Sequence, residues 1–144
     1  MALMHKNFYA SGFLYHSRSQ QILLQQKNSE QWTLLSGNGL QNESWEETFK
    51  RVVENCVHIK PSLSSIKQIY TYFNHDLKKE HFVSYVTVQK LTKFSATKDT
   101  SFAWFTFKQV TKLNLSSQTK QDITVGKRVI DSFLRKSLGQ QTIG

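Results

Sequence analysis

Residues 32–59, WTLLSGNGLQNESWEETFKRVVENCVHI, decide the fold because they join a short apolar segment to a well-marked helix. The stretch Ser36-Gly37-Asn38-Gly39 predicts a loop, since two glycines permit positive φ and a close approach of the backbone. Ser44 and Glu47 form an S-x-x-E capping box, so a helix is expected to begin there and to end before Pro61. Its apolar residues recur at helical spacing, namely Trp45, Phe49, Val52, Val53 and Cys56.

The segments outside this stretch alternate between strand and helix patterns. Strand patterns of β-branched and aromatic residues occur at 8–15, 21–26, 32–35, 66–73, 82–88 and 102–107. Polar stretches separate several of them, at 16–20, 27–31, 74–81 and 90–101. A closing helix is expected at 119–138, with one apolar stripe formed by Ile123, Ile130, Phe133, Leu134 and Leu138. This order predicts an α/β (α+β) fold in which a mixed sheet packs between helices.

The 144 residues fit a single domain, expected at 1–138, with a frayed tail at 139–144. One cysteine excludes an internal disulfide and a thiol zinc cluster, which favours a reducing, cytoplasmic location. No stretch approaches the ~20 apolar residues of a membrane span, and no signal peptide is apparent. The net charge of +9 attracts phosphate-bearing ligands, although scattered solvated lysines explain it equally. We expect neither a membrane partner nor a nucleic-acid partner.

The helix segment resembles the Nudix box, G-x5-E-x7-R-E-U-x-E-E-x-G-U, where U is apolar. Gly37, Glu43 and Arg51 keep its spacing, and Val53 and Ile59 supply the two apolar positions. The order of strands and helices along the rest of the chain agrees with the Nudix family as well. The resemblance therefore implies a Nudix-type α/β/α sandwich that covers nearly the whole chain.

The departures from the box concern its chemistry. In the family, three glutamates after the arginine bind divalent metal and help to activate water; here Val52, Asn55 and Cys56 hold those positions. Mg2+ prefers anionic oxygen ligands in octahedral geometry, which valine and cysteine do not supply. Glu54 does not replace them, because it lies roughly 160° from Val52 and Cys56 around the helix. The family's pattern also has a glycine at His58.

Two acidic residues remain as weak candidates for catalysis. Glu43 is the surviving acidic position of the box and the one candidate metal ligand, although it could instead complement the helix dipole or pair with Arg51. Asp99 lies in a loop before Trp104, where some Nudix enzymes recruit an acid, and a solvated loop charge is the plainer interpretation. His75 and His81 flank a turn and could approach each other, but no third metal ligand is in view.

Two functions from different classes follow. The first is a non-catalytic Nudix-fold module that binds a nucleotide-like ligand or a protein partner, with Trp32, Gly37, Gly39 and Arg51 as ligand-binding residues. The second is an active hydrolase of a nucleoside diphosphate linked to another moiety, with Mg2+ held by Glu43, a loop acid and water. We favour the first, because three lost anionic ligands must be replaced together to rebuild the metal site. The resemblance also leaves a homodimer open.

Overall fold

The computed structural model describes residues 5–139. Its strands are β1 His5–His16, β2 Gln21–Lys27, β3 Trp32–Thr33, β4 Leu35–Leu40, β5 Ile66–Asn74, β6 Lys79–Val88 and β7 Thr100–Thr106. Its helices are α1 Trp45–Val57, α2 Phe107–Val110 and α3 Ser117–Ser137, with a single 3-10 turn at Leu63–Ser65. Of the tail predicted at 139–144, residues 140–144 lie outside the described part of the chain.

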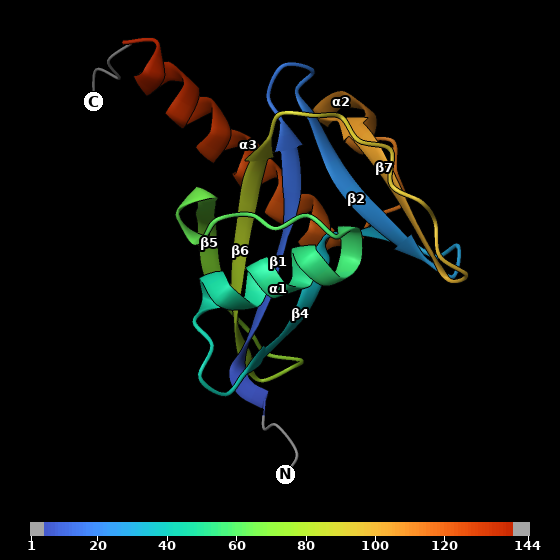
Figure 1. The fold of residues 1–144 in the computed structure, drawn as a ribbon, viewed down its shortest axis with the longest axis vertical. Helices are drawn as coiled ribbons and strands as arrows, with labels where there is room; N and C mark the ends of the chain where they lie inside the picture. Colours follow the sequence, from blue (N-terminus) through green and yellow to red (C-terminus); the bar gives the residue numbers. More distant parts are fainter. Residues whose placement is uncertain (1–4, 140–144) are drawn as a thin grey trace.

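The strand β1 organises the sheet, because it pairs with three other strands (Figure 1). It runs parallel to β6, from Phe8 opposite Glu80 to His16 opposite Val88. It is antiparallel to β2 at its end and to β4 along its first half. The main path of the sheet is β3-β2-β1-β6-β5, and β7 pairs with β2. The predicted mixed sheet is therefore confirmed.

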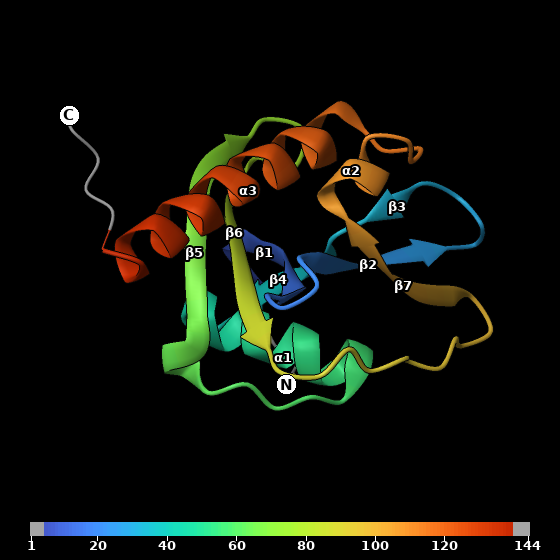
Figure 2. The same cartoon turned by 90° about the horizontal axis from the view of Figure 1, so that it is seen from above.

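The two long helices cover opposite faces of the sheet, with α1 on one side and α3 on the other (Figure 2). Alternating side chains of β1 divide between two cores, as a strand period of two requires. Ala10 and Leu14 pack in the cluster under α1, whereas Phe13 and Tyr15 pack in the cluster under α3. The result is the predicted helix–sheet–helix sandwich. Within residues 5–139, every helix is too short or too polar to span a membrane.

The predicted loop at residues 36–39 is wrong, because this segment is part of β4 and pairs with β1. Neither Gly37 nor Gly39 has a positive φ. The close approach expected of them is present: a Cβ on Gly37 would lie 2.8 Å from Val52 Cγ2, and one on Gly39 would lie 2.3 Å from Phe8 Cζ. These glycines therefore let other side chains pack onto the strand instead of forming a turn.

Both ends of α1 follow the local sequence. The Ser44 hydroxyl accepts a hydrogen bond from Glu47 N, and the Glu47 side chain accepts one from Ser44 N, so the predicted capping box is present. The helix ends at Val57, and His58 caps it in the left-handed conformation with φ of 60°. The family's pattern has glycine at this position, and glycine adopts this conformation without a steric cost.

The predicted closing helix is present as α3, and its apolar stripe is buried in one part and exposed in another. Ile123 and Ile130 are buried, as expected of a core stripe. Phe133, Leu134 and Leu138 were expected in the same stripe, but they are 49%, 48% and 66% exposed. The end of α3 extends past β5 (Figure 2), and Phe133 and Leu134 line an open cleft with Tyr15 and Tyr85 of the sheet, so this part of the stripe is only partly covered.

Candidate functional site

The face of α1 on which the box requires carboxylates is mostly apolar. Val52 is 4% exposed and packs against Gly37, in one cluster with Phe49 and Val53. Cys56 is half-buried in the same cluster, and burial raises the pKa of its thiol. Only Asn55 of the three substituted positions is exposed. The predicted apolar stripe of α1 is thus present in the structure, and it joins the helix to the sheet.

Glu43 and Arg51 are joined by a two-pronged ion pair. Arg51 Nε donates to Glu43 Oε2 at 2.8 Å, and Arg51 Nη2 donates to Oε1 at 3.1 Å. Glu43 Oε1 also accepts from Leu40 N at 2.9 Å and from the Thr48 hydroxyl at 3.0 Å. These donors, chiefly Arg51, hold the pKa of Glu43 at about 2. The second proton on Arg51 Nη2 goes to Asn38 O at 2.7 Å, so the pair ties α1 to β4.

The donor set around α1 does not fit Mg2+. The ion needs several anionic oxygens converging on one point, whereas both oxygens of Glu43 are engaged by the groups of α1 and the preceding turn. Among residues 5–139 there is no group of three His, Cys, Asp or Glu side chains that could hold a metal. Asp99 is exposed, and its backbone oxygen accepts from Asn28 N at 2.7 Å. No catalytic step through a metal can be derived from these residues.

A polar pocket of about 190 Å³ lies on the opposite face of the sheet, beside the start of α3. At its base His81 of β6 bridges two hydroxyls: its Nε2 lies 2.7 Å from Ser11 Oγ, and its Nδ1 lies 2.6 Å from the Tyr72 hydroxyl. Tyr9 donates to Ser36 Oγ at 2.9 Å on the β4 side. Burial lowers the pKa of His81 to about 4, so the ring is neutral near pH 7 and donates through only one nitrogen.

The wall formed by α3 adds a buried carboxylate. Asp122 is 3% exposed, and its Oδ1 accepts from Tyr70 at 2.5 Å and from Gln118 Nε2 at 2.9 Å. Burial raises the pKa of Asp122, although these two donors oppose the effect. Ser116 caps the helix here, and its hydroxyl accepts from Thr119 N, so the positive end of the helix dipole lies at the pocket. The pocket therefore offers donors and acceptors in close proximity.

The residues predicted to bind a ligand do not gather in one place. Trp32 packs edge-on against Phe105 at 4.9 Å, in the cluster under α3. Gly37 faces Val52 on the α1 side, and Arg51 is committed to Glu43 and Asn38. The two residues that follow Trp32, Thr33 and Leu34, line the polar pocket. Trp32 therefore directly precedes two pocket-lining residues in the sequence. Gly37, Gly39 and Arg51 lie instead on the face of the sheet that α1 covers.

The pocket's polar residues were missed as a group by sequence reasoning. Ser11 and His81 are 70 positions apart, and only the parallel pairing of β1 with β6 places them together. A weak signal was present in β1, where Ser11 interrupts the inward-facing series of Tyr9, Phe13 and Tyr15. The predicted approach of His75 to His81 does not occur at this site, since His75 packs against Phe73 while His81 engages Ser11 and Tyr72.

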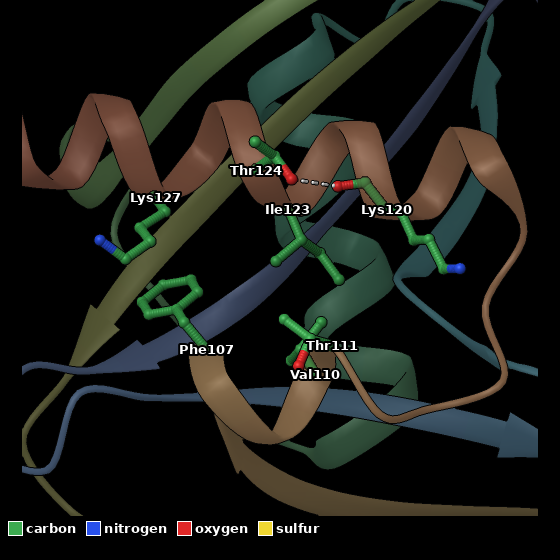
Figure 3. Close-up of a pocket in the computed structure, with 7 residues that line it drawn as sticks. All are labelled: Phe107, Val110, Thr111, Lys120, Ile123, Thr124 and Lys127. Atoms are coloured by element: carbon green, nitrogen blue, oxygen red, sulfur yellow. Dashed lines mark hydrogen bonds between the residues drawn. The ribbon is translucent and has the colours of Figure 1, made fainter.

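A second hollow, of about 280 Å³, lies between α2 and α3 (Figure 3). Phe107, Val110 and Ile123 form an apolar floor, and the side chains of Lys120 and Lys127 lie at its sides (Figure 3). Its two threonine hydroxyls donate to backbone oxygens of Lys108 and Lys120. This hollow therefore has fewer fixed polar side chains than the pocket around His81.

Comparisons with solved structures identify the fold of residues 5–139. The NUDIX domain of Shewanella oneidensis NrtR, complexed with ADP ribose, superposes with a TM-score of 0.70 at 16% identity, over 88% of this chain and 90% of that one. The chain has the Nudix fold. The E. coli dihydroneopterin triphosphate pyrophosphohydrolase shares it, with a TM-score of 0.67 at 14% identity over 90% and 99% of the two chains.

The Nudix fold also occurs in a protein–protein complex. The C-terminal domain of mouse MUTYH, solved with human PCNA, matches with a TM-score of 0.65 at 14% identity, over 94% of both chains. No known protein family matches the sequence, and no curated protein matches it either. The structural neighbours thus include an enzyme, a ligand complex and a partner complex, so the fold by itself does not decide which activity this chain has.

Proposed function

We propose that this protein is a non-catalytic Nudix-fold module that binds a small nucleotide-like ligand without the magnesium-dependent pyrophosphohydrolase chemistry of the family. One observation carries the proposal: the α1 face that would hold the metal contains Val52, 4% exposed, beside a Glu43 that is tied to Arg51. Neutralising the charges of a pyrophosphate without a metal would require cations at that face. Arg51, the one arginine of α1, is already paired with Glu43.

The polar pocket at the start of α3 is the proposed ligand site. Its hydroxyl, imidazole and carboxylate groups match the mixed donors and acceptors of a nucleoside or a related heterocycle, and Tyr72 and Tyr9 add aromatic surface. The N-terminus of α3 favours a negatively charged group nearby. The neighbour NrtR is complexed with ADP ribose, a ligand that combines a base, sugars and phosphates. A reducing, cytoplasmic location is part of this proposal.

Hydrolysis by a rearranged metal site is the competing function. It would require Glu43 to exchange Arg51 for Mg2+ and Asp99 to reach the same ion from an exposed loop. Both changes run against the observed contacts, because four donors hold the Glu43 carboxylate in place.

The test measures binding and turnover on the same sample. We expect ADP-ribose to raise the melting temperature, and to give a saturable calorimetric titration, in buffer that contains EDTA. Gln118→Ala, at the rim of the pocket, should weaken binding about 5-fold or more, because it removes a donor that positions Asp122. The matched control is Gln121→Ala on the same helix, an exposed glutamine that does not line the pocket.

Turnover separates the two functions. The proposal predicts no release of AMP or phosphate from ADP-ribose or dinucleoside polyphosphates with Mg2+ or Mn2+. Metal-dependent turnover that disappears in Glu43→Gln would overturn it in favour of the hydrolase. If neither ADP-ribose nor a dinucleoside polyphosphate binds, the ligand-binding role itself is overturned.

A further inference from the structure

The C-terminal third of α3 forms one wall of an open cleft of about 600 Å³. Ile130, Phe133 and Leu134 come from the helix, and Tyr15 and Tyr85 come from the sheet. Phe133 and Leu134 are each about half exposed at the mouth of this cleft, and Leu138, one turn further, is 66% exposed. Exposed apolar patches of this kind mark binding surfaces more often than isolated apolar residues do.

The hollow between α2 and α3 (Figure 3) lies along the same helix, nearer to its start. The ring of Phe107 in that hollow lies 6.2 Å from the ring of Tyr15 in the cleft, so the two share a wall. Together they form a surface along α3 from Lys120 to Leu138, which we term the α3 groove. At ~1.5 Å per residue, its length is about 27 Å.

The α3 groove is positively charged. Lys67, Lys120 and Lys127 line its two hollows, and no Asp or Glu is among the described residues that line them. Arg135 follows in the last turn of the helix, whereas Lys136 lies about 160° from Lys120 around the helix axis and faces away from the groove. Asp131 neutralises Lys127, with which it pairs at 2.9 Å, and it is close enough to Tyr15 of the cleft to raise the pKa of that hydroxyl, so Lys67 and Lys120 carry the positive charge of the two hollows. An apolar floor with cations along its sides complements an acidic amphipathic segment.

We propose that the α3 groove docks an acidic amphipathic helix of a partner protein. The apolar face of that helix covers Phe133, Leu134 and the floor around Phe107, while its carboxylates meet Lys67 and Lys120. A small molecule in the cleft would leave Leu138 uncovered, because the apolar patch extends a turn beyond it. A second copy of this chain, packed α3 against α3, would bring the cations of both copies together. The site is separate from the ligand pocket around His81.

The experiment uses a fluorescein-labelled 16-residue peptide with leucines on one helical face and glutamates on the other. Fluorescence anisotropy follows its binding to the full chain at 50 and 300 mM salt. We expect saturable binding that weakens at the higher salt, since exposed charges are screened. A peptide with the same leucines but lysines in place of the glutamates should bind at least about 10-fold more weakly.

Three variants test the surface. Phe133→Ser with Leu134→Ser should weaken the acidic peptide about 10-fold or more, because both side chains lie at the mouth of the cleft. Lys120→Glu replaces an exposed side chain and leaves the apolar floor intact, and it should weaken binding of the acidic peptide about 5-fold. Leu77→Ser is the matched control: Leu77 is 49% exposed in the turn between β5 and β6, and the variant should bind as the parent does.

The proposal is overturned if the two peptides bind equally well. It is also overturned if the Phe133 and Lys120 variants bind the acidic peptide as tightly as the parent does. Binding to vesicles containing phosphatidylserine without binding to the peptide overturns it as well, since that assigns the surface to a membrane. A concentration-dependent dimer that Phe133→Ser dissociates would assign it to a second copy. Circular dichroism of each variant shows whether the fold is retained, and Lys120→Glu keeps the test decisive if the double variant unfolds.

Discussion

Replacing Glu43 with glutamine should cost stability because the carboxylate joins α1 to its neighbours. The side chain of Glu43 is 17% exposed and that of Arg51 is 31% exposed, and Arg51 also reaches Asn38 in β4. The pKa of Glu43 falls from 4.5 to about 2 in the folded protein. That difference corresponds to about 3 kcal/mol at neutral pH. Solvent near the pair reduces the amount, so we expect Glu43→Gln to lose about 1.5 kcal/mol.

The pH dependence identifies the source of this loss. The folded carboxylate stays ionised down to about pH 2, whereas the unfolded carboxylate takes up a proton near pH 4.5. The stabilisation is therefore complete above pH 4.5 and disappears as the pH falls toward 2. The difference in unfolding free energy between parent and Glu43→Gln should be largest at pH 7 and less than half as large at pH 3.

Urea unfolding followed by tryptophan fluorescence, at pH 7 and pH 3, measures both quantities. Asp99→Asn is the matched control, because Asp99 is an exposed acid in the loop before β7. Arg51→Met completes a double-mutant cycle that isolates the ion pair. Equal losses in Glu43→Gln and Asp99→Asn, or a loss that stays the same at pH 3, would refute the structural role assigned to Glu43.

Three further predictions concern single positions. His58→Gly should raise the unfolding free energy by about 0.5–1 kcal/mol in urea unfolding, because His58 has φ of 60°; a decrease would contradict this. Val52→Glu should lower it by about 3 kcal/mol or more, since an unpaired carboxylate would be buried against Gly37; an unchanged melting temperature would show that the face tolerates charge. Burial of neutral His81, with its pKa of about 4, should make the protein lose up to about 3 kcal/mol as the pH falls from 6.5 to 4. A proton NMR titration of the His81 ring with a midpoint above 6 would contradict this.

Local signals in the sequence predicted the parts of the fold that depend on local chemistry. The S-x-x-E pattern at Ser44 placed the start of α1 correctly, because a capping box needs only residues within one turn. The segment containing Gly37 and Gly39 was misread, since glycine has a low strand propensity. Pairing with β1 and the packing of Val52 override that propensity, and both depend on contacts far along the chain.

Longer-range features were beyond the sequence patterns. The apolar stripe of α3 correctly indicated which face of the helix packs, but not how much of that face is covered, so the exposure of Phe133 could not be predicted. The polar pocket needs Ser11, His81 and Asp122 from three separate elements. In the sequence, each of these three residues is consistent with an ordinary buried polar side chain that has a structural partner. Only the three-dimensional arrangement of the strands and α3 shows that they line one cavity.

The pairing of β1 also sets an order for folding during synthesis. Its parallel neighbour β6 ends at Val88, so β1 leaves the ribosome long before that partner is available. The hairpin of β1 with β2 and the contact with β4 close first, since they need only the first forty residues. Until β6 arrives, one edge of β1 carries unpaired backbone groups, and edges of this kind promote association between nascent chains. Slow translation between β4 and β6 should therefore lower the yield of folded protein.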